Sequence, residues 1–445
     1  MLVLNPSFIV TMDRECRIIK DGFIGIEEGK IVYVSKEKPQ EYEEIIRLPK
    51  RVLLPGFINT HTHVAMTILR GLKDDVNLQR WLMEYILPVE KLLKPKDVYY
   101  GALYGIAEMI KSGTTTFMDM YYHEIEVAKA AADAKIRSVL TYGLADVFFN
   151  TLPEEEFKKA EKFKDDLSAL VSSRGLDDFL FFAYGPHSPY GCTKELLQIV
   201  REAADRDNFR IHIHLSETKS EVENSVRTSN MTPIEYLESV GFLKSDVMAA
   251  HVVWPTDGDI EILKHRGVHV LHNPTSNLKL ASGVAPVPKF LEKGINVALA
   301  TDGPASNNRL DMWKEISLAA LIHKGISRDP EVISARTALQ MATINGAYAL
   351  GLERKIGSLE VGKYADFVVV NLERALESVP FHDVYSMIVY ALDSRYIDSV
   401  WINGELMYSQ ENVLKTIDVQ KLREIVNDIR IRLTQEAGIK TPSEV

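Results

Sequence analysis

The sequence has little of what several classes of protein require. Its 445 residues include only two cysteines, Cys16 and Cys192, too few for a disulfide framework or a cysteine-rich zinc site. No apolar run approaches the roughly 18 residues that a membrane-spanning helix needs. The first residues carry no basic segment followed by an apolar one, so they do not resemble a signal peptide. These absences favour a protein of a reducing, cytoplasmic compartment.

An excess of positive charge is also missing. The chain has 52 Lys and Arg against 62 Asp and Glu, a formal net charge of -10, with a sequence pI of about 5.7. This balance argues against nucleic acid or an anionic membrane as the main partner. Hydrophobic residues make up 46% and charged residues 26%, so the chain can bury a large core. Its length allows two or three domains, or one large barrel with appendages.

The middle of the chain alternates apolar strand-like runs with segments of helical periodicity. Eight such strands alternating with helices are typical of a (β/α)8 TIM-like barrel. An open doubly wound sheet is the alternative, but no Gly-rich phosphate turn follows the first run. Polar residues also gather at the carboxyl ends of several runs, which favours the barrel. The predicted strands are residues 52–57, 115–118, 137–142, 180–184, 210–215, 247–250, 268–271 and 296–300.

Both ends of the chain are rich in short β segments. Asn403-Gly404 lies between two such segments and predicts a hairpin turn. Asp418 is placed to cap a final helix that ends at about Ala437. We therefore expect the two ends, residues 1–56 and 357–445, to form a small β-sandwich domain with a C-terminal helix, beside a barrel of residues 57–356. The expected strands of the small domain are residues 8–12, 22–27, 30–34, 364–370 and 399–402.

Side chains of metal-ligand types follow several of the predicted barrel strands. His61 and His63 are two residues apart at the end of the first strand, so both point to one face. In the fifth strand His212 and His214 also share a face, either inward or outward, and Glu217 follows three residues after His214. Because the carboxyl ends of barrel strands meet at one mouth, we expect a metal site there. The ends of the later strands add His251, His272 and Asp302.

Several stretches resemble the amidohydrolase superfamily, and within it the S-adenosylhomocysteine/5'-methylthioadenosine deaminases. They include the Leu-Pro-Val-Glu sequence that ends at Glu90, the His-Leu-Ser-Glu sequence that ends at Glu217, and the Thr-Asp-Gly sequence around Asp302. The resemblance extends over nearly the whole chain and implies a metal-dependent hydrolase. The remaining matching stretches are residues 55–71, 185–190, 273–280 and 357–366.

The resemblance implies that His61, His63, His214 and Asp302 hold the metal. Three imidazoles and one carboxylate suit Zn²⁺ with an open position for water, and Fe²⁺ is a second possibility. Members of the superfamily with two metals use a carboxylated lysine at the end of the fourth strand, whereas residues 182–187 contain no lysine. We therefore expect one zinc ion per subunit.

The same resemblance gives each catalytic residue a role. A metal of this kind lowers the pKa of bound water toward about 7. Asp302 would accept the proton of that water, and His251 would orient the water by a hydrogen bond without being a metal ligand. Glu217 would deliver a proton to N1 of an adenine ring and later carry one to the leaving ammonia.

Three further residues are expected to contact the substrate. In the resembling enzymes the glutamate at the position of Glu90 accepts hydrogen bonds from both ribose hydroxyls. His187, in a Pro-His-Ser-Pro loop, is expected near the ribose or the base. Trp81 shares a helical face with Leu78 and Leu82, so it either belongs to the core or covers an apolar tail of the substrate.

The chain departs from the family at the end of the third strand. Members that take S-adenosylhomocysteine hold its carboxylate with arginines there and in the following loop. This chain has Tyr142 at that place, and residues 145–152 contain no Arg or Lys. A buried carboxylate without a cation is costly. We therefore expect Tyr142 to line the site and the substrate to carry a neutral 5' group, as in 5'-methylthioadenosine or adenosine.

The sequence thus predicts a zinc-dependent aminohydrolase that converts 5'-modified adenosines to their inosine analogues and ammonia, acting as a homo-oligomer on a small nucleoside. A guanine deaminase or a chlorotriazine hydrolase of the same branch would share every metal ligand. Glu217 and Glu90 together favour a nucleoside substrate. A non-catalytic barrel subunit is a further alternative, and the complete ligand set speaks against it.

Overall fold

The computed structural model describes residues 1–410 and 414–439, and the chain has an α/β fold. Contacts between Cα atoms divide it into two compact units. Of the described residues, the first contains Met1–Asn59, Ala107–Phe117 and those of Asp311–Ile417, and the second contains Thr60–Ile106, Met118–Leu310 and those from Asp418 to residue 439. The boundaries predicted at residues 56 and 357 stay a prediction.

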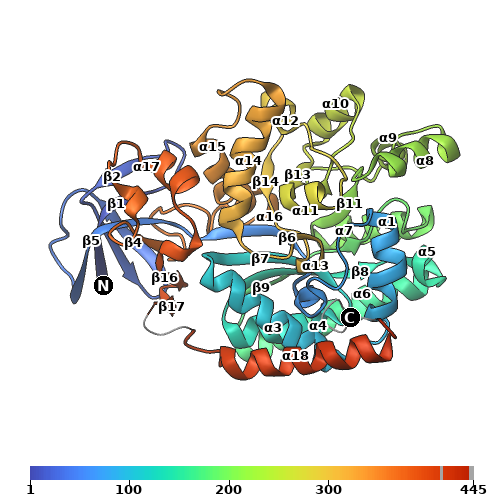
Figure 1. The fold of residues 1–445 in the computed structure, drawn as a ribbon, viewed down its shortest axis with the longest axis horizontal. Coiled ribbons are helices and arrows are strands. Elements are labelled where there is room, and N and C mark those ends of the chain that lie inside the picture. Colours follow the sequence, from blue (N-terminus) through green and yellow to red (C-terminus); the bar gives the residue numbers. More distant parts are fainter. Residues whose placement is uncertain (411–413, 440–445) are drawn as a thin grey trace. The chain divides into compact units, whose positions relative to one another are not determined.

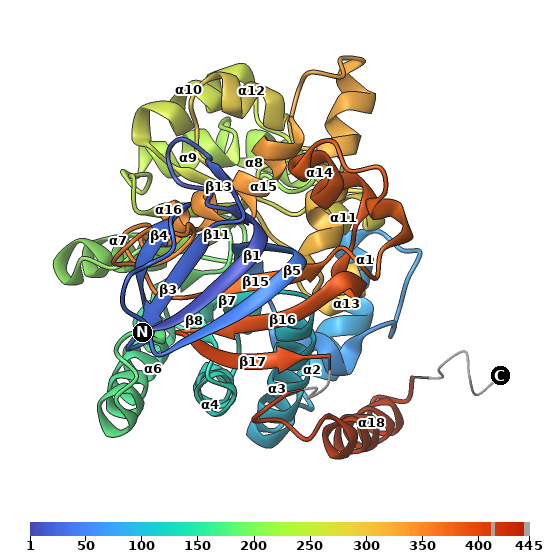
Figure 2. The same ribbon diagram turned by 90° about the vertical axis from the view of Figure 1, so that its left-hand side faces the viewer.

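The first unit is built around an eight-stranded sheet with the order β17-β16-β15-β5-β1-β3-β4, in which β2 pairs with β1. Figure 2 shows these strands side by side. Strands from both ends of the chain meet where β5 runs parallel to β1 and antiparallel to β15. The strands are β1 (Leu2–Val10), β2 (Ile18–Lys20), β3 (Phe23–Glu27), β4 (Lys30–Ser35), β5 (Glu44–Pro55), β15 (Phe367–Asn371), β16 (Ile397–Ile402) and β17 (Glu405–Ser409).

The predicted hairpin is confirmed. Ile402 pairs with Glu405 across the antiparallel β16 and β17, and both residues of the turn have positive φ, 52° for Asn403 and 71° for Gly404. Such values are those of the type I′ turn that joins two strands by two residues.

The prediction that residues 52–57 form the first barrel strand is wrong. Val52 to Pro55 are the end of β5 and pair with β1 and β15 in the eight-stranded sheet. Pro55, which has no N–H to donate, is the last residue of β5. The next residue is glycine, and a Cβ on Gly56 would lie 2.1 Å from Thr115 Oγ1, so a larger residue would displace the Thr115 side chain. The strand that leads to the histidines therefore begins only at Phe57, as β6 (Phe57–Thr62).

The remaining strands form two parallel sheets, in the orders β10-β8-β7-β6, with β9 on β8, and β11-β12-β13-β14. A β-bridge between Tyr184 and Ile211 links the first of these sheets to β11, at one edge of the second. At the opposite edges, the N–H of Asp302, just after β14, donates a hydrogen bond to the carbonyl of His61 in β6. Their residues are almost all buried on both faces, as is typical of parallel strands covered by helices. Besides β6 they are β7 (Thr114–Tyr121), β8 (Arg137–Leu144), β9 (Leu180–Phe182), β10 (Gly185–Pro186), β11 (Ile211–Leu215), β12 (Val247–His251), β13 (His269–His272) and β14 (Val297–Leu299), which overlap the other predicted runs.

Helices alternate with these strands along the chain (Figure 1). The longer ones are α3 (Pro95–Lys111), α4 (Glu124–Ala134), α6 (Pro153–Arg174), α7 (Lys194–Asp207), α8 (Lys219–Ser229), α10 (Asp257–Arg266), α14 (Met312–Ser327) and α18 (Val419–Glu436). Shorter helical segments are η1 (Val64–Leu69), α1 (Leu78–Arg80), η2 (Trp81–Ile86), α2 (Leu87–Glu90), α5 (Asp146–Phe149), α9 (Pro233–Ser239), α11 (Pro274–Lys279), α12 (Val287–Glu292), α13 (Pro304–Asn307), α15 (Ala335–Met341), α16 (Ile344–Leu350), η3 (Leu376–Ser378), α17 (Val384–Ser386), η4 (Met387–Ala391) and η5 (Ser394–Tyr396).

The predicted C-terminal helix is present as α18. The Asp418 side chain accepts the N–H of Lys421 and caps it, and Arg432 forms an ion pair with Asp97 at the start of α3. Figures 1 and 2 both show α18 beside α3. Within the described part of the chain, no helix combines the length and apolar character needed to cross a membrane.

Candidate active site

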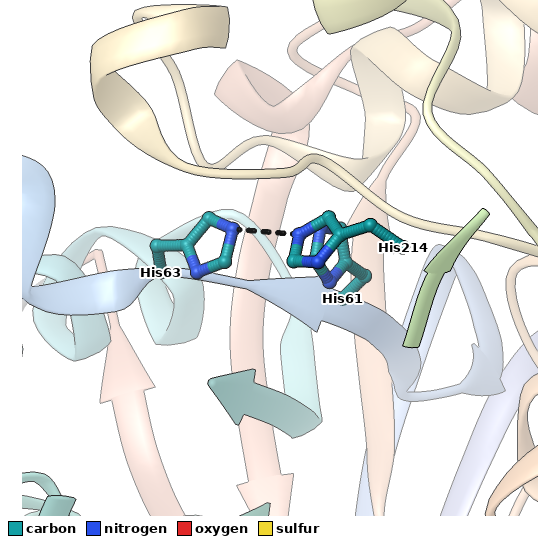
Figure 3. Close-up of side chains that lie close together, drawn as sticks. All are labelled: His61, His63 and His214. Carbon is teal, nitrogen blue, oxygen red and sulfur yellow. Dashed lines mark hydrogen bonds between the residues drawn. The ribbon is translucent and has the colours of Figure 1, made fainter. Parts of the chain in front are cut away.

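Three histidines converge at the carboxyl ends of β6 and β11 (Figure 3). The Nδ1 of His63 lies 2.6 Å from the Met120 carbonyl, and the Nδ1 of His214 lies 2.8 Å from the His187 carbonyl. A carbonyl only accepts hydrogen bonds, so each Nδ1 carries the proton and each Nε2 keeps a free lone pair. The two Nε2 atoms face each other at 3.3 Å.

Asp302, after β14, completes this cluster. Its Oδ1 lies 3.4 Å from Nε2 of both His61 and His63. Its Oδ2 accepts hydrogen bonds from the Ser276 and Ser306 hydroxyls at 2.6 and 2.9 Å. Burial alone would raise the pKa of Asp302, but its interaction with His61 and the charges of the other nearby histidines hold that pKa well below its usual range. The carboxyl is therefore ionised and points one oxygen at the imidazoles.

The cluster fits a divalent metal ion. Two imidazole lone pairs that face each other at 3.3 Å repel unless a cation lies between them. His61 is fully buried, and neither of its ring nitrogens has a hydrogen-bond partner. The ligand atoms of His61, His63 and His214, and those of His61, His251 and Asp302, lie within 4.8 Å of one another. Neutral imidazoles with a carboxylate are the ligands that zinc and similar ions use.

Glu217 and His251 lie next to each other beside the cluster. Glu217 Oε2 lies 3.7 Å from His251 Nε2, and Glu217 Oε1 accepts a hydrogen bond of 3.2 Å from the Ser282 hydroxyl. Burial raises the pKa of the Glu217 carboxyl, which favours its protonated form. The Nδ1 of His251 lies 2.8 Å from Asn277 Oδ1, an acceptor, so Nε2 of His251 faces Glu217 and the cavity.

Glu90 lies on another wall of the same cavity, at the end of α2. It is buried, its Oε1 accepts the Tyr121 hydroxyl at 2.7 Å, and burial raises its pKa. Trp81 also lines the cavity, with 5% of its surface exposed, and its indole N–H has no hydrogen-bond partner. Trp81 is therefore a wall of the cavity and not only part of the core.

His187 lines the cavity next to a metal ligand. Its ring stacks on the ring of His214, with centroids 4.6 Å apart. Burial and the neighbouring histidines lower the pKa of His187 to about 3, so its ring is neutral. Its Nδ1 lies 3.0 Å from the Ser188 hydroxyl. A neutral imidazole of this kind can donate or accept one hydrogen bond with a ligand.

The contact predicted for Tyr142 stays a prediction. Among the described residues that line the cavity, its neighbour Gly143 is present and Tyr142 is absent. Alternation along the strand does not decide which residues of β8 reach the cavity, because the successive residues Met120, Tyr121 and Tyr122 at the end of β7 all line it. Burial and the nearby Glu156 raise the pKa of Tyr142 to about 12.

A second, larger cavity of about 1070 Å³ adjoins the first. Leu78, Leu82, Tyr190 and Leu280 line both. Among the described lining residues of the two cavities, Lys219 is the one Lys or Arg, and it is largely exposed and 3.4 Å from Glu223. The larger cavity is otherwise lined mainly by apolar and uncharged polar side chains.

The structure adds residues to which the sequence gave no role. His212 is fully buried, and its ring centroid lies 4.8 Å from that of His61. The two histidines of β11 thus both face inward, a choice that alternation alone left open. Asp119, on β7, accepts the Thr62 hydroxyl and the Val64 N–H, the neighbours of His63. Asp119 could have been found from the sequence, because it is an acidic residue within an otherwise apolar strand-like run.

Comparison with known proteins agrees with this geometry. Residues 52–407 match the amidohydrolase family. The chain is 41% identical over 423 residues to a 5'-deoxyadenosine deaminase of Methanosarcina acetivorans, covering 95% of this chain and 96% of the relative. It is 44% identical over 407 residues to a 5-methylthioadenosine/S-adenosylhomocysteine deaminase of Thermococcus sibiricus, covering 92% and 94%.

Solved structures give the same result. An adenosine deaminase from Xanthomonas campestris with bound zinc superposes with a TM-score of 0.91 at 33% identity, over 98% of both chains. An atrazine chlorohydrolase from Arthrobacter aurescens, complexed with zinc, superposes with a TM-score of 0.88 at 24% identity, over 97% of this chain and all of that one, which shows a shared fold. The chain is therefore a member of the amidohydrolase family, which supports a divalent metal ion at its histidine–aspartate cluster.

Proposed function

We propose that this protein is a zinc-dependent aminohydrolase that deaminates the adenine ring of 5'-modified adenosines. The observation on which the proposal depends is the Glu217 carboxyl, with a raised pKa, beside His251 and the histidine–aspartate cluster. Relatives named as deaminases of 5'-deoxyadenosine and of 5-methylthioadenosine and S-adenosylhomocysteine support it.

One zinc ion per chain is the proposed cofactor, with Fe²⁺ as the alternative, held by His61, His63, His214 and Asp302. When bound, such an ion lowers the pKa of water to near neutrality and polarises the reacting carbon–nitrogen system. A mononuclear site is supported by residues 182–187, at the end of the fourth strand, which contain no lysine to bridge a second ion.

The chain's own residues move the protons. Asp302 accepts a proton from the attacking water, and His251 Nε2 orients that water. Glu217, protonated, delivers a proton to N1 of the ring as the new C6–O bond forms. Glu217 then carries the remaining proton of the new C6 hydroxyl to the amino group, the C6–N6 bond breaks, and ammonia and the inosine analogue leave. The proton held by Asp302 returns through solvent to Glu217 and restores the acid. The Ser282 hydroxyl, 3.2 Å from Glu217 Oε1, holds the acid in place.

The ribose and the base are bound by the cavity walls. Glu90 accepts the 2'- and 3'-hydroxyls, and Tyr121 orients its carboxylate by the 2.7 Å hydrogen bond. His187 contacts the base or the ribose, and Trp81 covers the nucleoside with its ring. The adjoining cavity accommodates the 5' substituent. Its shortage of cations favours neutral groups over the amino-acid carboxylate of S-adenosylhomocysteine.

The finer architecture belongs to the same proposal. We expect the parallel strands β6 to β14 to close into a (β/α)8 barrel, supported by the hydrogen bonds at both pairs of sheet edges. The strands from the chain ends would form a small β-sandwich domain, with boundaries near residues 56 and 357. We also propose a cytoplasmic homo-oligomer, without nucleic acid or membrane partners. The two cysteines of the chain are buried and form no disulfide, which supports a reducing compartment.

A spectrophotometric substrate screen tests the function. Purified protein would be assayed with adenosine, 5'-deoxyadenosine, 5'-methylthioadenosine, S-adenosylhomocysteine, guanine and a chlorotriazine. We expect turnover of the adenosines and none of guanine or the triazine. Turnover confined to either of the last two would overturn the proposal in favour of another amidohydrolase activity.

A further inference from the structure

Two helices of the second unit begin with a complete capping box. In α9, Thr232 accepts the N–H of Glu235, and the Glu235 carboxylate accepts the N–H of Thr232. In α10, Thr256 and Asp259 exchange hydrogen bonds in the same way. In both helices the acid three residues after the N-cap satisfies the backbone of its own cap.

Helix α8 has the same sequence pattern, Thr218 followed by Glu221, but uses its acid differently. Thr218 accepts the N–H of Glu221. The Glu221 carboxylate reaches past the cap, so that Oε1 accepts the Ser216 N–H at 2.9 Å and Oε2 accepts the Glu217 N–H at 2.8 Å. Both oxygens of one side chain thus hold the backbone of the catalytic glutamate and of the residue before it.

The segment so held is a sharp turn between β11 and α8. Ser216 has a φ of 49°, in the left-handed region that is unfavourable for a non-glycine residue. Its carbonyl accepts the N–H groups of Val253 and Trp254, both at 3.0 Å. The turn is therefore fixed on one side by the chain after β12 and on the other by Glu221. The direction of the Glu217 side chain follows from this backbone.

We propose that Glu221 is a positioning residue for proton transfer by Glu217. Its carboxylate holds the N–H groups of Ser216 and Glu217, which keeps the Glu217 carboxyl beside Ser282 and His251. This inference rests on the proposed deamination, in which Glu217 is the proton donor. Glu221 acts through the backbone and takes no part in the chemistry itself.

The variant Glu221→Gln tests the proposal. Glutamine has one acceptor oxygen and one donor NH₂, so one of the two backbone N–H groups would face a donor. We expect kcat to fall by roughly 10²-fold, the effect of a misplaced catalytic group, with KM nearly unchanged. The loss should be the same for adenosine and for 5'-methylthioadenosine. Glu221 also lines the second, larger cavity. If Glu221 acted by binding the substrate, the variant would instead raise KM, by an amount that depends on the 5' group of the substrate.

A double-mutant cycle separates positioning from general damage. In the Glu217→Gln background the group to be positioned is gone, so adding Glu221→Gln should lower kcat little further. Equal loss of kcat in both backgrounds would overturn the proposal, because it would mean that Glu221 supports the site independently of Glu217. Near-wild-type kcat in folded Glu221→Gln would overturn it as well.

Asp259→Asn is the matched control, since Asp259 is also the third residue of its helix and its carboxylate also accepts a backbone N–H, that of Thr256. It should lower the melting temperature and leave kcat near wild type. If Glu221→Gln fails to fold, Glu221→Asp keeps both acceptors but is one methylene shorter. It should then show the same loss of kcat, and wild-type kcat in this variant would refute the role. Absence of deamination in the wild-type protein would overturn the proposed function itself, a result distinct from any of these.

Discussion

Replacing Glu217 by glutamine is the sharpest perturbation of the proposed chemistry. Glutamine has the same shape, and its side-chain oxygen can still accept the hydrogen bond that Ser282 donates at 3.2 Å. What the variant loses is the proton on the carboxyl, which burial favours by raising its pKa. None of the four proposed metal ligands is changed, so the metal content should stay as in the wild type.

The expected loss follows from the role of the proton. General acid catalysis by a positioned side chain is worth about 10²–10⁴ in rate. At about 1.36 kcal/mol for each factor of ten, this is about 2.7–5.4 kcal/mol of transition-state stabilisation. Losing only the Ser282 hydrogen bond, as in Ser282→Ala, should cost about 0.5–1.5 kcal/mol and therefore roughly tenfold or less. The two variants should thus be well separated in kcat.

The assay is the change in ultraviolet absorbance as an adenosine becomes an inosine, measured with the metal content of each sample. Because the donor must be protonated, kcat/KM of the wild type should fall as pH rises through the raised pKa of Glu217. The residual activity of Glu217→Gln should not show this fall in kcat/KM with rising pH. Turnover of Glu217→Gln close to the wild type, at equal metal content, would show that Glu217 is structural and would refute the mechanism.

Three further predictions concern the metal and the substrate. Purified protein should contain about one zinc or iron ion per chain by elemental analysis, and two tightly bound ions would contradict the mononuclear site. Glu90→Gln should lower kcat/KM for nucleosides by about 10–100-fold, since it weakens charge-assisted hydrogen bonds to the ribose, and an unchanged kcat/KM would remove Glu90 from the ribose site. Wild-type kcat/KM should be higher for 5'-methylthioadenosine, 5'-deoxyadenosine or adenosine than for S-adenosylhomocysteine. Tyr142→Arg should narrow that gap by placing a cation at the end of β8. Gly143→Arg should do the same, because a Cβ at Gly143 meets no atom closer than 3.5 Å and lies beside the cavity-lining Met120.

Local signals in the sequence were enough for some parts of the fold. The Asn403-Gly404 hairpin follows from two residues that accept positive φ, and the Asp418 cap needs only its own helix. The apolar run at residues 52–55 shows the limit of such signals. Any strand that is buried on both faces has a continuous apolar sequence. Such a run therefore indicates a strand but does not tell which sheet the strand joins. Only the pairing with β1 and β15 separates it from the strand of His61.

In the active site, too, local sequence predicts some features and leaves others open. The spacing of His61 and His63 places both on one face, and the structure confirms that they converge with His214. The contact predicted for Tyr142 stays a prediction, because successive residues at the end of the neighbouring β7 all line the cavity and alternation alone does not decide which residues of β8 do. Local sequence also left the direction of Glu221 open. Its Thr-x-x-Glu pattern is shared by α9, and only the tertiary position of the β11–α8 turn directs its carboxylate to Ser216 and Glu217.

The most direct test of the proposed reaction follows the fate of the amino group and the water. The zinc-loaded protein would be incubated with 5'-deoxyadenosine in water enriched in the heavy oxygen isotope, and the products analysed by mass spectrometry together with an ammonia assay. The account predicts one ammonia per nucleoside consumed and one labelled oxygen in the 5'-deoxyinosine formed. Release of free adenine, or product formation without ammonia, would contradict it.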